Sequence, residues 1–99
     1  MYEHNSRIHS FAAIAAIILG FLMKIDLIEW CLLIIAIGMV FITELLNSSL
    51  ESIADSIKPE WNDMIGKAKD YSAAAVLIAA IISLLVGVII FVPKLLDLI

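Results

Sequence analysis

Three long apolar stretches separated by short polar ones set the pattern of this chain. The first runs over 8–23 without a formal charge and, at about 1.5 Å per residue, covers roughly 24 Å of helix. That length is short for a hydrocarbon core of about 30 Å, so the stretch spans a bilayer only if its helix begins upstream. We therefore predict a first membrane span over about 8–23, in a helix that starts close to the N-terminus.

The second apolar stretch follows a short polar turn. Asp26, with Glu29 three residues later, forms the pattern of a helix N-cap and its capping-box partner, which predicts a helix start near Leu27. The residues between Glu29 and Glu44 carry no charge, so Glu44 is expected close to the opposite interface of a second span over about 28–46.

The third stretch, 71–92, is the clearest span, because its 22 uncharged residues make about 33 Å of helix. Asp63 can cap the third helix, and Pro93 follows the span. The helical pattern of the second stretch continues until Pro59 stops it, so that helix projects beyond the bilayer. We predict an all-α chain with a single membrane domain over 1–99, built as a three-transmembrane-helix bundle.

Composition supports a bilayer location. The chain is 64% hydrophobic and 16% charged, with a mean hydropathy of +1.12, whereas a soluble domain is roughly 45 to 50% apolar. The net charge of −4 leaves no basic patch that could follow a nucleic-acid backbone, so nucleic acid is excluded as a partner.

The distribution of basic residues predicts an orientation. Four of them lie in the N-terminal segment and between the second and third spans, against two on the other side. By the positive-inside rule the N-terminus and the 44–70 region face the cytoplasm. The four are Arg7, Lys58, Lys67 and Lys69, and the two are Lys24 and Lys94.

A polar stripe marks the end of the second span. Asn47, Ser48, Glu51 and Asp55 all project within about 60° of Glu44 around a helix. An ionisable group at membrane depth costs roughly 2.5 to 3.5 kcal/mol, so such groups are seldom kept without a use. Two neighbouring helices shield such a stripe poorly, which predicts a homo-oligomer.

The residue types of the stripe limit its chemistry. The sequence has no glycine-rich phosphate loop, no serine-hydrolase elbow and no histidine pair at metalloprotease spacing. Carboxylates suit Mg²⁺, with Glu51 the best-placed ligand, and Lys67 and Lys69 can neutralise phosphate charge. A carboxylate of the stripe could then accept a proton from an attacking hydroxyl, which predicts a membrane kinase. A solvated helix end would also carry Glu51 and Asp55.

Two segments carry a resemblance to a known family: Glu44-Leu-Leu-Asn-Ser-Ser-Leu-Glu-Ser-Ile-Ala-Asp55, and Gly66-Lys-Ala-Lys-Asp70 followed by Ala73-Ala-Ala-Val76. They resemble the prokaryotic integral-membrane diacylglycerol kinase family, which includes the undecaprenol kinases. Glu3 with Arg7-Ile-His9 is a weaker match, and the likeness covers essentially the whole chain.

The resemblance implies a homotrimer of three-span subunits in the bacterial inner membrane, with composite sites at the cytoplasmic face. Each site would transfer the γ-phosphoryl group of ATP, bound with Mg²⁺, to the primary alcohol of a lipid. By matching position, the resemblance implies that Glu44 is the general base and that Glu51 and Glu3 are metal ligands. It implies five nucleotide-binding residues, namely Asn47, Glu51, Lys69, Asp70 and Glu3, and supporting roles for Asp55 and Ser48.

The family pattern leaves two points open. Members carry an amphipathic surface helix ahead of the position of Glu3, and we expect that helix to be missing from this sequence. The acceptor lipid is either diacylglycerol or undecaprenol, although Arg7-Ile-His9 and Pro93-Lys94 resemble the undecaprenol type more closely.

Two further alternatives concern single residues and the function class. His9, taken alone, is more typical of a satisfied interfacial histidine than of a phosphate contact. A small non-enzymatic oligomeric membrane protein, such as a pore or an assembly subunit, is the competing hypothesis. A pore should carry polar residues through the depth of a span, whereas 71–92 is polar only at its start and at Ser83, which favours surface chemistry.

Overall fold

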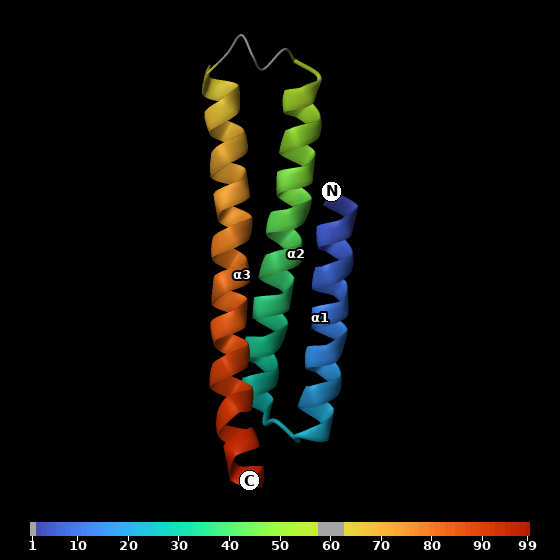
Figure 1. Cartoon of the computed structure of the whole chain (residues 1–99), viewed down its shortest axis with the longest axis vertical. Helices are drawn as coiled ribbons and strands as arrows, with labels where there is room; N and C mark the ends of the chain where they lie inside the picture. Colours follow the sequence, from blue (N-terminus) through green and yellow to red (C-terminus); the bar gives the residue numbers. More distant parts are fainter. Residues whose placement is uncertain (1, 58–62) are drawn as a thin grey trace.

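The chain forms three helices, as predicted. The computed structural model describes the backbone of 2–57 and 63–99 and the side chains of 7–57 and 63–99. In this part of the chain the elements are α1 (Tyr2–Leu22), α2 (Leu27–Asp55) and α3 (Asp63–Leu98). Helices α2 and α3 lie antiparallel along most of their length, and the shorter α1 packs against α2 (Figure 1). The helix stop predicted at Pro59 lies outside the described residues.

The turn between α1 and α2 ends the first helix sharply. Lys24 has a positive φ of 53°, and its N–H donates to the carbonyl of Phe21 at 3.3 Å while the N–H of Ile25 donates to that of Gly20 at 3.2 Å. This pair of bonds is a Schellman motif, which satisfies carbonyls that the helix end would otherwise leave without partners. Lysine occupies the position that usually carries glycine.

The start of α2 confirms the predicted cap. The N–H of Glu29 donates to Asp26 Oδ1 at 2.8 Å, and the N–H of Asp26 donates to Glu29 Oε1 at 3.0 Å. These two reciprocal bonds form a capping box, and α2 begins at Leu27. The turn and the cap together return the chain antiparallel to α1.

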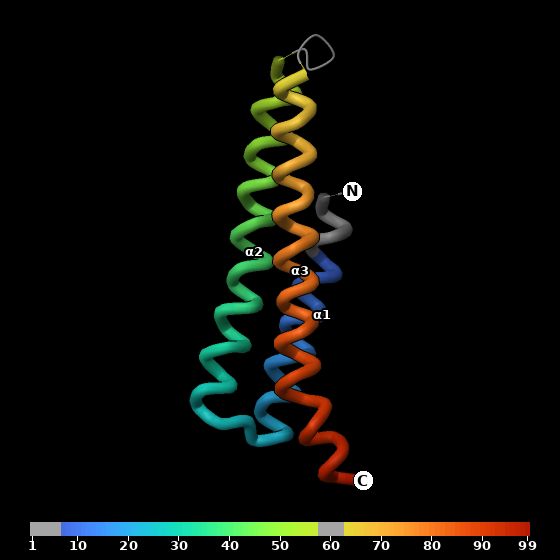
Figure 2. The backbone as a smooth tube through the Cα atoms, turned by 90° about the vertical axis from the view of Figure 1, so that its left-hand side faces the viewer, coloured from blue at the N-terminus to red at the C-terminus, as the bar shows by residue number. Residues whose placement is uncertain are grey.

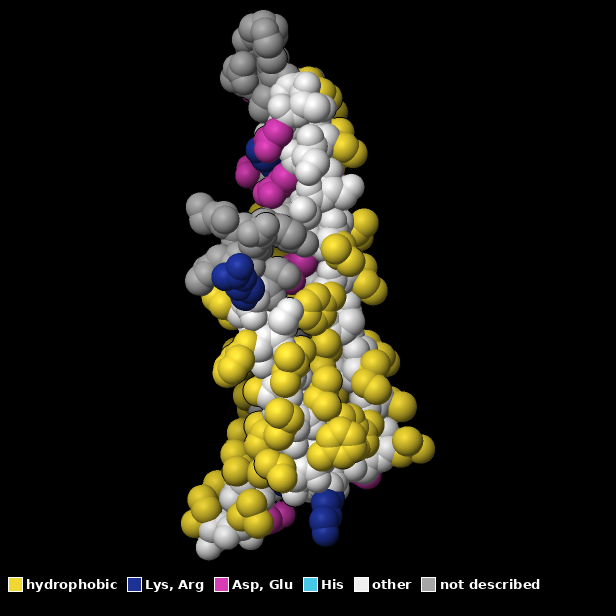
Figure 3. Space-filling view, turned by 90° about the vertical axis from the view of Figure 1, so that its right-hand side faces the viewer, with side chains coloured by type: hydrophobic (Ala, Val, Ile, Leu, Met, Phe, Trp, Pro, Cys, Tyr) yellow, Lys and Arg dark blue, Asp and Glu magenta, His cyan; other side chains and the backbone are white. Residues whose placement is uncertain are grey.

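The molecule buries little and exposes most of its large apolar side chains. Its buried cluster consists of Ile25, Leu33, Ile90 and Phe91, while apolar residues cover much of the outer surface (Figure 3). Such a surface suits a hydrocarbon environment or contacts between subunits. Helices α2 and α3 are long and apolar enough to cross a membrane, whereas the apolar part of α1, Arg7–Leu22, is shorter.

Both ends of α3 extend past the predicted span of 71–92. Asp63 is the first residue of α3 and not a cap before it, and Pro93 lies inside the helix, which continues to Leu98. Proline removes one helical hydrogen bond and crowds the preceding turn, and the last turns of α3 veer from its main axis (Figure 2). At about 1.5 Å per residue α3 is about 54 Å long, so it projects well beyond a hydrocarbon core.

Candidate active site

The polar stripe of α2 faces α3 and α1 from Glu44 to Glu51, whereas Asp55 at its end is exposed. Glu44 is buried, and Asn47, Ser48 and Glu51 are half-buried, whereas Leu45 on the opposite side is exposed. In the space-filling view, acidic and basic side chains gather beyond the apolar band at this end of the molecule (Figure 3). The predicted helical periodicity therefore brings these polar groups to one face, as the sequence pattern indicated.

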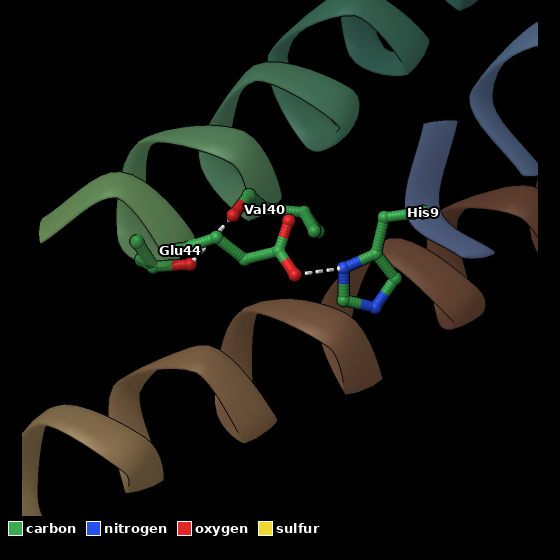
Figure 4. Close-up of polar contacts among 4 residues, drawn as sticks. His9, Val40 and Glu44 are labelled. Atoms are coloured by element: carbon green, nitrogen blue, oxygen red, sulfur yellow. Dashed lines mark hydrogen bonds and ion pairs between the residues drawn. The ribbon is translucent and has the colours of Figure 1, made fainter. Parts of the chain in front are cut away.

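Glu44 is the most enclosed ionisable side chain of the described part, and it contacts α1. Only 4% of its side chain is exposed, and its Oε2 lies 2.5 Å from Nδ1 of His9 (Figure 4). Its other oxygen, Oε1, is buried and has no hydrogen-bond partner among the described residues. A buried polar atom without a partner is costly and rare, so Oε1 is a candidate to bind a group that is not among the described residues.

Asn47 lies on the same stripe and contacts α3. The hydroxyl of Ser72 donates to Asn47 Oδ1 at 2.7 Å. Because the amide oxygen accepts this bond, the NH₂ group of Asn47 is the part left to donate to another group. An amide oriented in this way suits a phosphate or a carboxylate oxygen.

Further along the stripe, Lys69 of α3 pairs with Asp55 of α2. Lys69 Nζ lies 3.0 Å from Asp55 Oδ1. The hydrogen bond with Asp55 and then its negative charge raise the pKa of Lys69 above its ordinary value of 10.5; the charge of Glu51 adds a smaller effect and desolvation opposes it. The pair is solvent-exposed, so it contributes little to stability, but it gathers a lysine and two carboxylates at one helix interface.

The structure does not bring every predicted residue to this group. Asp70 is exposed and forms no hydrogen bond or ion pair with the other described residues. Ser48 is half-buried without a recorded partner there, and the side chain of Glu3 lies outside the described residues. Among the described side chains, no three potential ligands converge on a metal position.

The donor chemistry around Glu51 nevertheless fits Mg²⁺. Its carboxylate is half-buried and has no hydrogen bond or ion pair with described residues. Mg²⁺ usually takes one or two protein carboxylates and completes its coordination with phosphate oxygens and water. Glu51 therefore has the donor chemistry that such an ion needs, whereas Glu3, the second predicted carboxylate ligand, lies outside the described side chains.

An apolar groove reaches the same region. Its volume is about 430 Å³, and residues of all three helices line it. His9 lies among the lining residues, and so do the small residues Ala13 of α1 and Ala80 and Gly87 of α3. The groove thus connects an apolar channel along the helices with the histidine that contacts Glu44.

Sequence reasoning interpreted His9 as a satisfied interfacial histidine and did not single out Ser72, although both contact residues of the stripe. His9 lies 13 residues before the end of α1 at Leu22, and Glu44 lies 17 residues after the start of α2 at Leu27, so antiparallel helices place them within about one helical turn of each other. The same symmetry relates Asn47 and Ser72 about the segment between α2 and α3. Distance from a turn was therefore the signal that could have found both residues.

Comparison with known proteins gives consistent matches. The family profile described as Prokaryotic diacylglycerol kinase matches residues 1–91. The undecaprenol kinase of Bacillus subtilis (strain 168) is 41% identical over 93 residues, which are 94% of this chain and 76% of that protein. The diacylglycerol kinase of Escherichia coli (strain K12) is 36% identical over 83 residues, 84% of this chain and 68% of that protein.

A cyanobacterial relative extends the comparison. The diacylglycerol kinase of Synechocystis sp. is 37% identical over 97 residues, which are 97% of this chain. The chain spans 55% of that protein's length. No solved structure gives a significant match.

Proposed function

The chain belongs to the prokaryotic diacylglycerol kinase family and is a lipid kinase of that family, and from this premise we propose how its own residues perform the reaction. The substrates are ATP, as Mg²⁺ complex, and the primary alcohol of a membrane lipid. The observation that carries the proposal is Oε1 of Glu44, which is buried without a partner among the described residues and lies at the groove end that holds His9.

Glu44 acts as general base. The hydroxyl of the lipid donates its proton to a Glu44 carboxylate oxygen while its oxygen bonds to the γ-phosphorus, and the bond between that phosphorus and the β–γ bridging oxygen breaks to release ADP. Glu44 becomes a neutral carboxylic acid until the proton leaves to water. Burial of the carboxylate keeps competing water away from the base.

The nucleotide binds along the α2–α3 interface beyond Glu44. Lys69 neutralises phosphate charge, and the NH₂ group of Asn47 donates to a phosphate oxygen or orients the base. Asp70, which is exposed, contacts the nucleoside, and Glu51 with Glu3 holds Mg²⁺. Asp55 supports the site by its ion pair with Lys69, and Ser48 lines the stripe between Asn47 and Glu51.

The lipid chain lies in the apolar groove, with its hydroxyl toward His9 and Glu44. The apolar lining supports this placement, because a hydrocarbon chain packs against apolar side chains without burying an unpaired polar group. The acceptor is diacylglycerol or undecaprenol, the two lipids named in the relatives, and the higher identity with the B. subtilis undecaprenol kinase favours undecaprenol.

The subunit spans the membrane three times and assembles as a homotrimer. Helix α1 begins at Tyr2, upstream of its apolar stretch, so it gains the length that a span requires. The exposed apolar faces of the three helices provide surface for lipid and for neighbouring subunits. The stripe lies at the cytoplasmic face, because basic residues are in excess on that side of the chain and the positive-inside rule places such segments in the cytoplasm.

The family assignment decides against a pore or an assembly subunit as the main function. The polar residues agree with that decision, since Glu44 and Glu51 lie in the second half of α2 and Lys69 lies in the first turns of α3, so they are not spread through the depth of the bundle.

The test is a phosphorylation assay in detergent micelles with MgATP and either diacylglycerol or undecaprenol. We expect phosphate incorporation into at least one lipid and loss of incorporation in Glu44→Gln, with the oligomer intact by size-exclusion chromatography. Full activity of Glu44→Gln would overturn the assignment of the base. Absence of activity with both lipids from a well-folded oligomer would overturn the proposed reaction for this chain.

A further inference from the structure

The contact between His9 and Glu44 assigns different tasks to the two carboxylate oxygens. Oε2 lies 2.5 Å from Nδ1 of His9, while Oε1 is buried and has no partner among the described residues. Glu44 has a flexible side chain, and nothing else recorded in the described part holds its carboxylate. The orientation of the base therefore depends on a residue of a different helix (Figure 4).

Resting on the proposed function, we infer that His9 is a positioning residue: its Nδ1–H donates to Glu44 Oε2 and thereby fixes Oε1 as the oxygen that takes the proton of the lipid hydroxyl. Nδ1 keeps its proton throughout, and the transferred proton resides on Oε1. When a hydrogen bond holds one oxygen of a carboxylate, the other oxygen points in a fixed direction. The Glu44 side chain then loses less rotational freedom when the transition state forms.

Three observations favour this role over simple packing. The His9 side chain is 25% exposed, so it is not there mainly to fill a core. It lines the apolar groove, which places the imidazole beside the route of the acceptor lipid. The bond also joins α1 to the stripe of α2, so it ties a residue of the groove wall to the proposed base.

Two variants of His9 test the inference, and they differ in whether the new side chain can donate a hydrogen bond to Glu44 Oε2. His9→Asn keeps an N–H donor near the position of Nδ1, His9→Leu removes the donor but keeps an apolar side chain, and Ser10→Ala is the control on the neighbouring residue of α1. Turnover number and acceptor KM are measured separately for the better acceptor lipid, and the thermal midpoint in detergent monitors folding.

We expect His9→Leu to lower the turnover number roughly 10- to 100-fold with little change in acceptor KM. His9→Asn should recover most of that loss, and Ser10→Ala should stay within about twofold of the wild type. Equal losses in His9→Asn and His9→Leu, or no loss in His9→Leu, would overturn the inference.

A double-variant cycle separates positioning from a structural role. In a Glu44→Gln background His9→Leu should cause no further loss of activity, because there is no base left to orient. An additive loss would contradict the inference. Activity in Glu44→Gln would contradict the proposed function itself. Loss of activity in Glu44→Gln together with a normal turnover number in His9→Leu would contradict only the role of His9.

Discussion

Two glutamates of α2, one near each end of its apolar part, illustrate two different uses of a carboxylate. Glu29 lies in the first turn, where its Oε1 accepts from the N–H of Asp26 at 3.0 Å and lies 3.2 Å from Nζ of Lys94. Glu44 lies about four turns further along, and its Oε1 has no partner among the described residues. The first side chain is 22% exposed and the second 4%.

The difference in hydrogen bonding and exposure indicates which of the two glutamates stabilises the fold. Glu29 completes a cap and ties α2 to α3, so its charge is satisfied by the fold. Leaving a buried acceptor unsatisfied costs about 1 to 3 kcal/mol, and a site optimised for stability alone would not keep Glu44 in that state. The contacts of Lys24, Glu29 and Lys94 thus stabilise one end of the bundle, and on the proposed function the end that holds Glu44 carries the chemistry.

The largest expected effect is on the rate of lipid phosphorylation, when the charges of Glu44 and Glu29 are removed in two separate variants. Glu44→Gln should lower the rate of lipid phosphorylation by about 10² to 10⁴, the usual contribution of a general base. Glu29→Gln should leave the rate within about twofold, because glutamine can still complete the capping box. The measurement is initial rate of phosphate incorporation per folded oligomer, and similar losses in both variants would break the comparison.

The second effect tests packing at the structural end. A methyl group on Gly20 would lie 2.7 Å from the ring of Trp30, so Gly20→Ala should lower the free energy of unfolding by about 1 to 3 kcal/mol. The turnover number of the folded fraction should not change. Gly38→Ala is the matched control, since nothing lies within 4 Å of its added methyl and alanine favours a helix. The measurement is the thermal unfolding midpoint of each variant in detergent, and equal midpoints for Gly20→Ala and Gly38→Ala would contradict the prediction.

A smaller effect concerns the charges beyond Glu44. Asp55→Asn should lower the pKa of Lys69 toward 10.5, because the hydrogen bond and charge of Asp55 are what raise it. The raised pKa means that the ion pair stabilises the fold below pH 10.5 and that this contribution disappears as pH rises through the folded-state pKa.

The pKa of Lys69 can be followed by NMR of labelled lysine side chains. Asp70→Asn is the control, because Asp70 is adjacent in sequence but makes no ion pair among the described residues. An unchanged Lys69 pKa in Asp55→Asn would show that the pair is not formed in solution.

The smallest effect is expected at the turn. Lys24→Gly should raise the free energy of unfolding by up to about 1 kcal/mol, because the positive φ of 53° suits glycine better than lysine. Lys24→Ala removes the same charge without relieving the backbone, so it should bring no such gain. The rate of phosphorylation should be unchanged in both, and a gain in Lys24→Ala equal to that in Lys24→Gly would assign the effect to charge.

The sequence by itself determined the local features of this protein. The spacing of apolar residues predicted three helices, Asp26 and Glu29 predicted the start of α2, and the recurrence of acids every three or four residues predicted that Glu44 and Glu51 share one face. The motifs of the stripe also indicated the kinase family, which the comparisons confirmed. Each of these depends on residues within a few turns of one helix, where the helical repeat fixes geometry.

Only the tertiary structure decided which polar groups meet across helices. The pairing of His9 with Glu44, of Ser72 with Asn47 and of Lys69 with Asp55 depends on the axial register of antiparallel helices. A Schellman turn and a capping box set that register between α1 and α2, and side-chain packing sets it between α2 and α3. A hydrogen bond is lost over a shift of about 1 Å, so composition and periodicity could place a polar stripe but could not say which of its oxygens would be left without a partner.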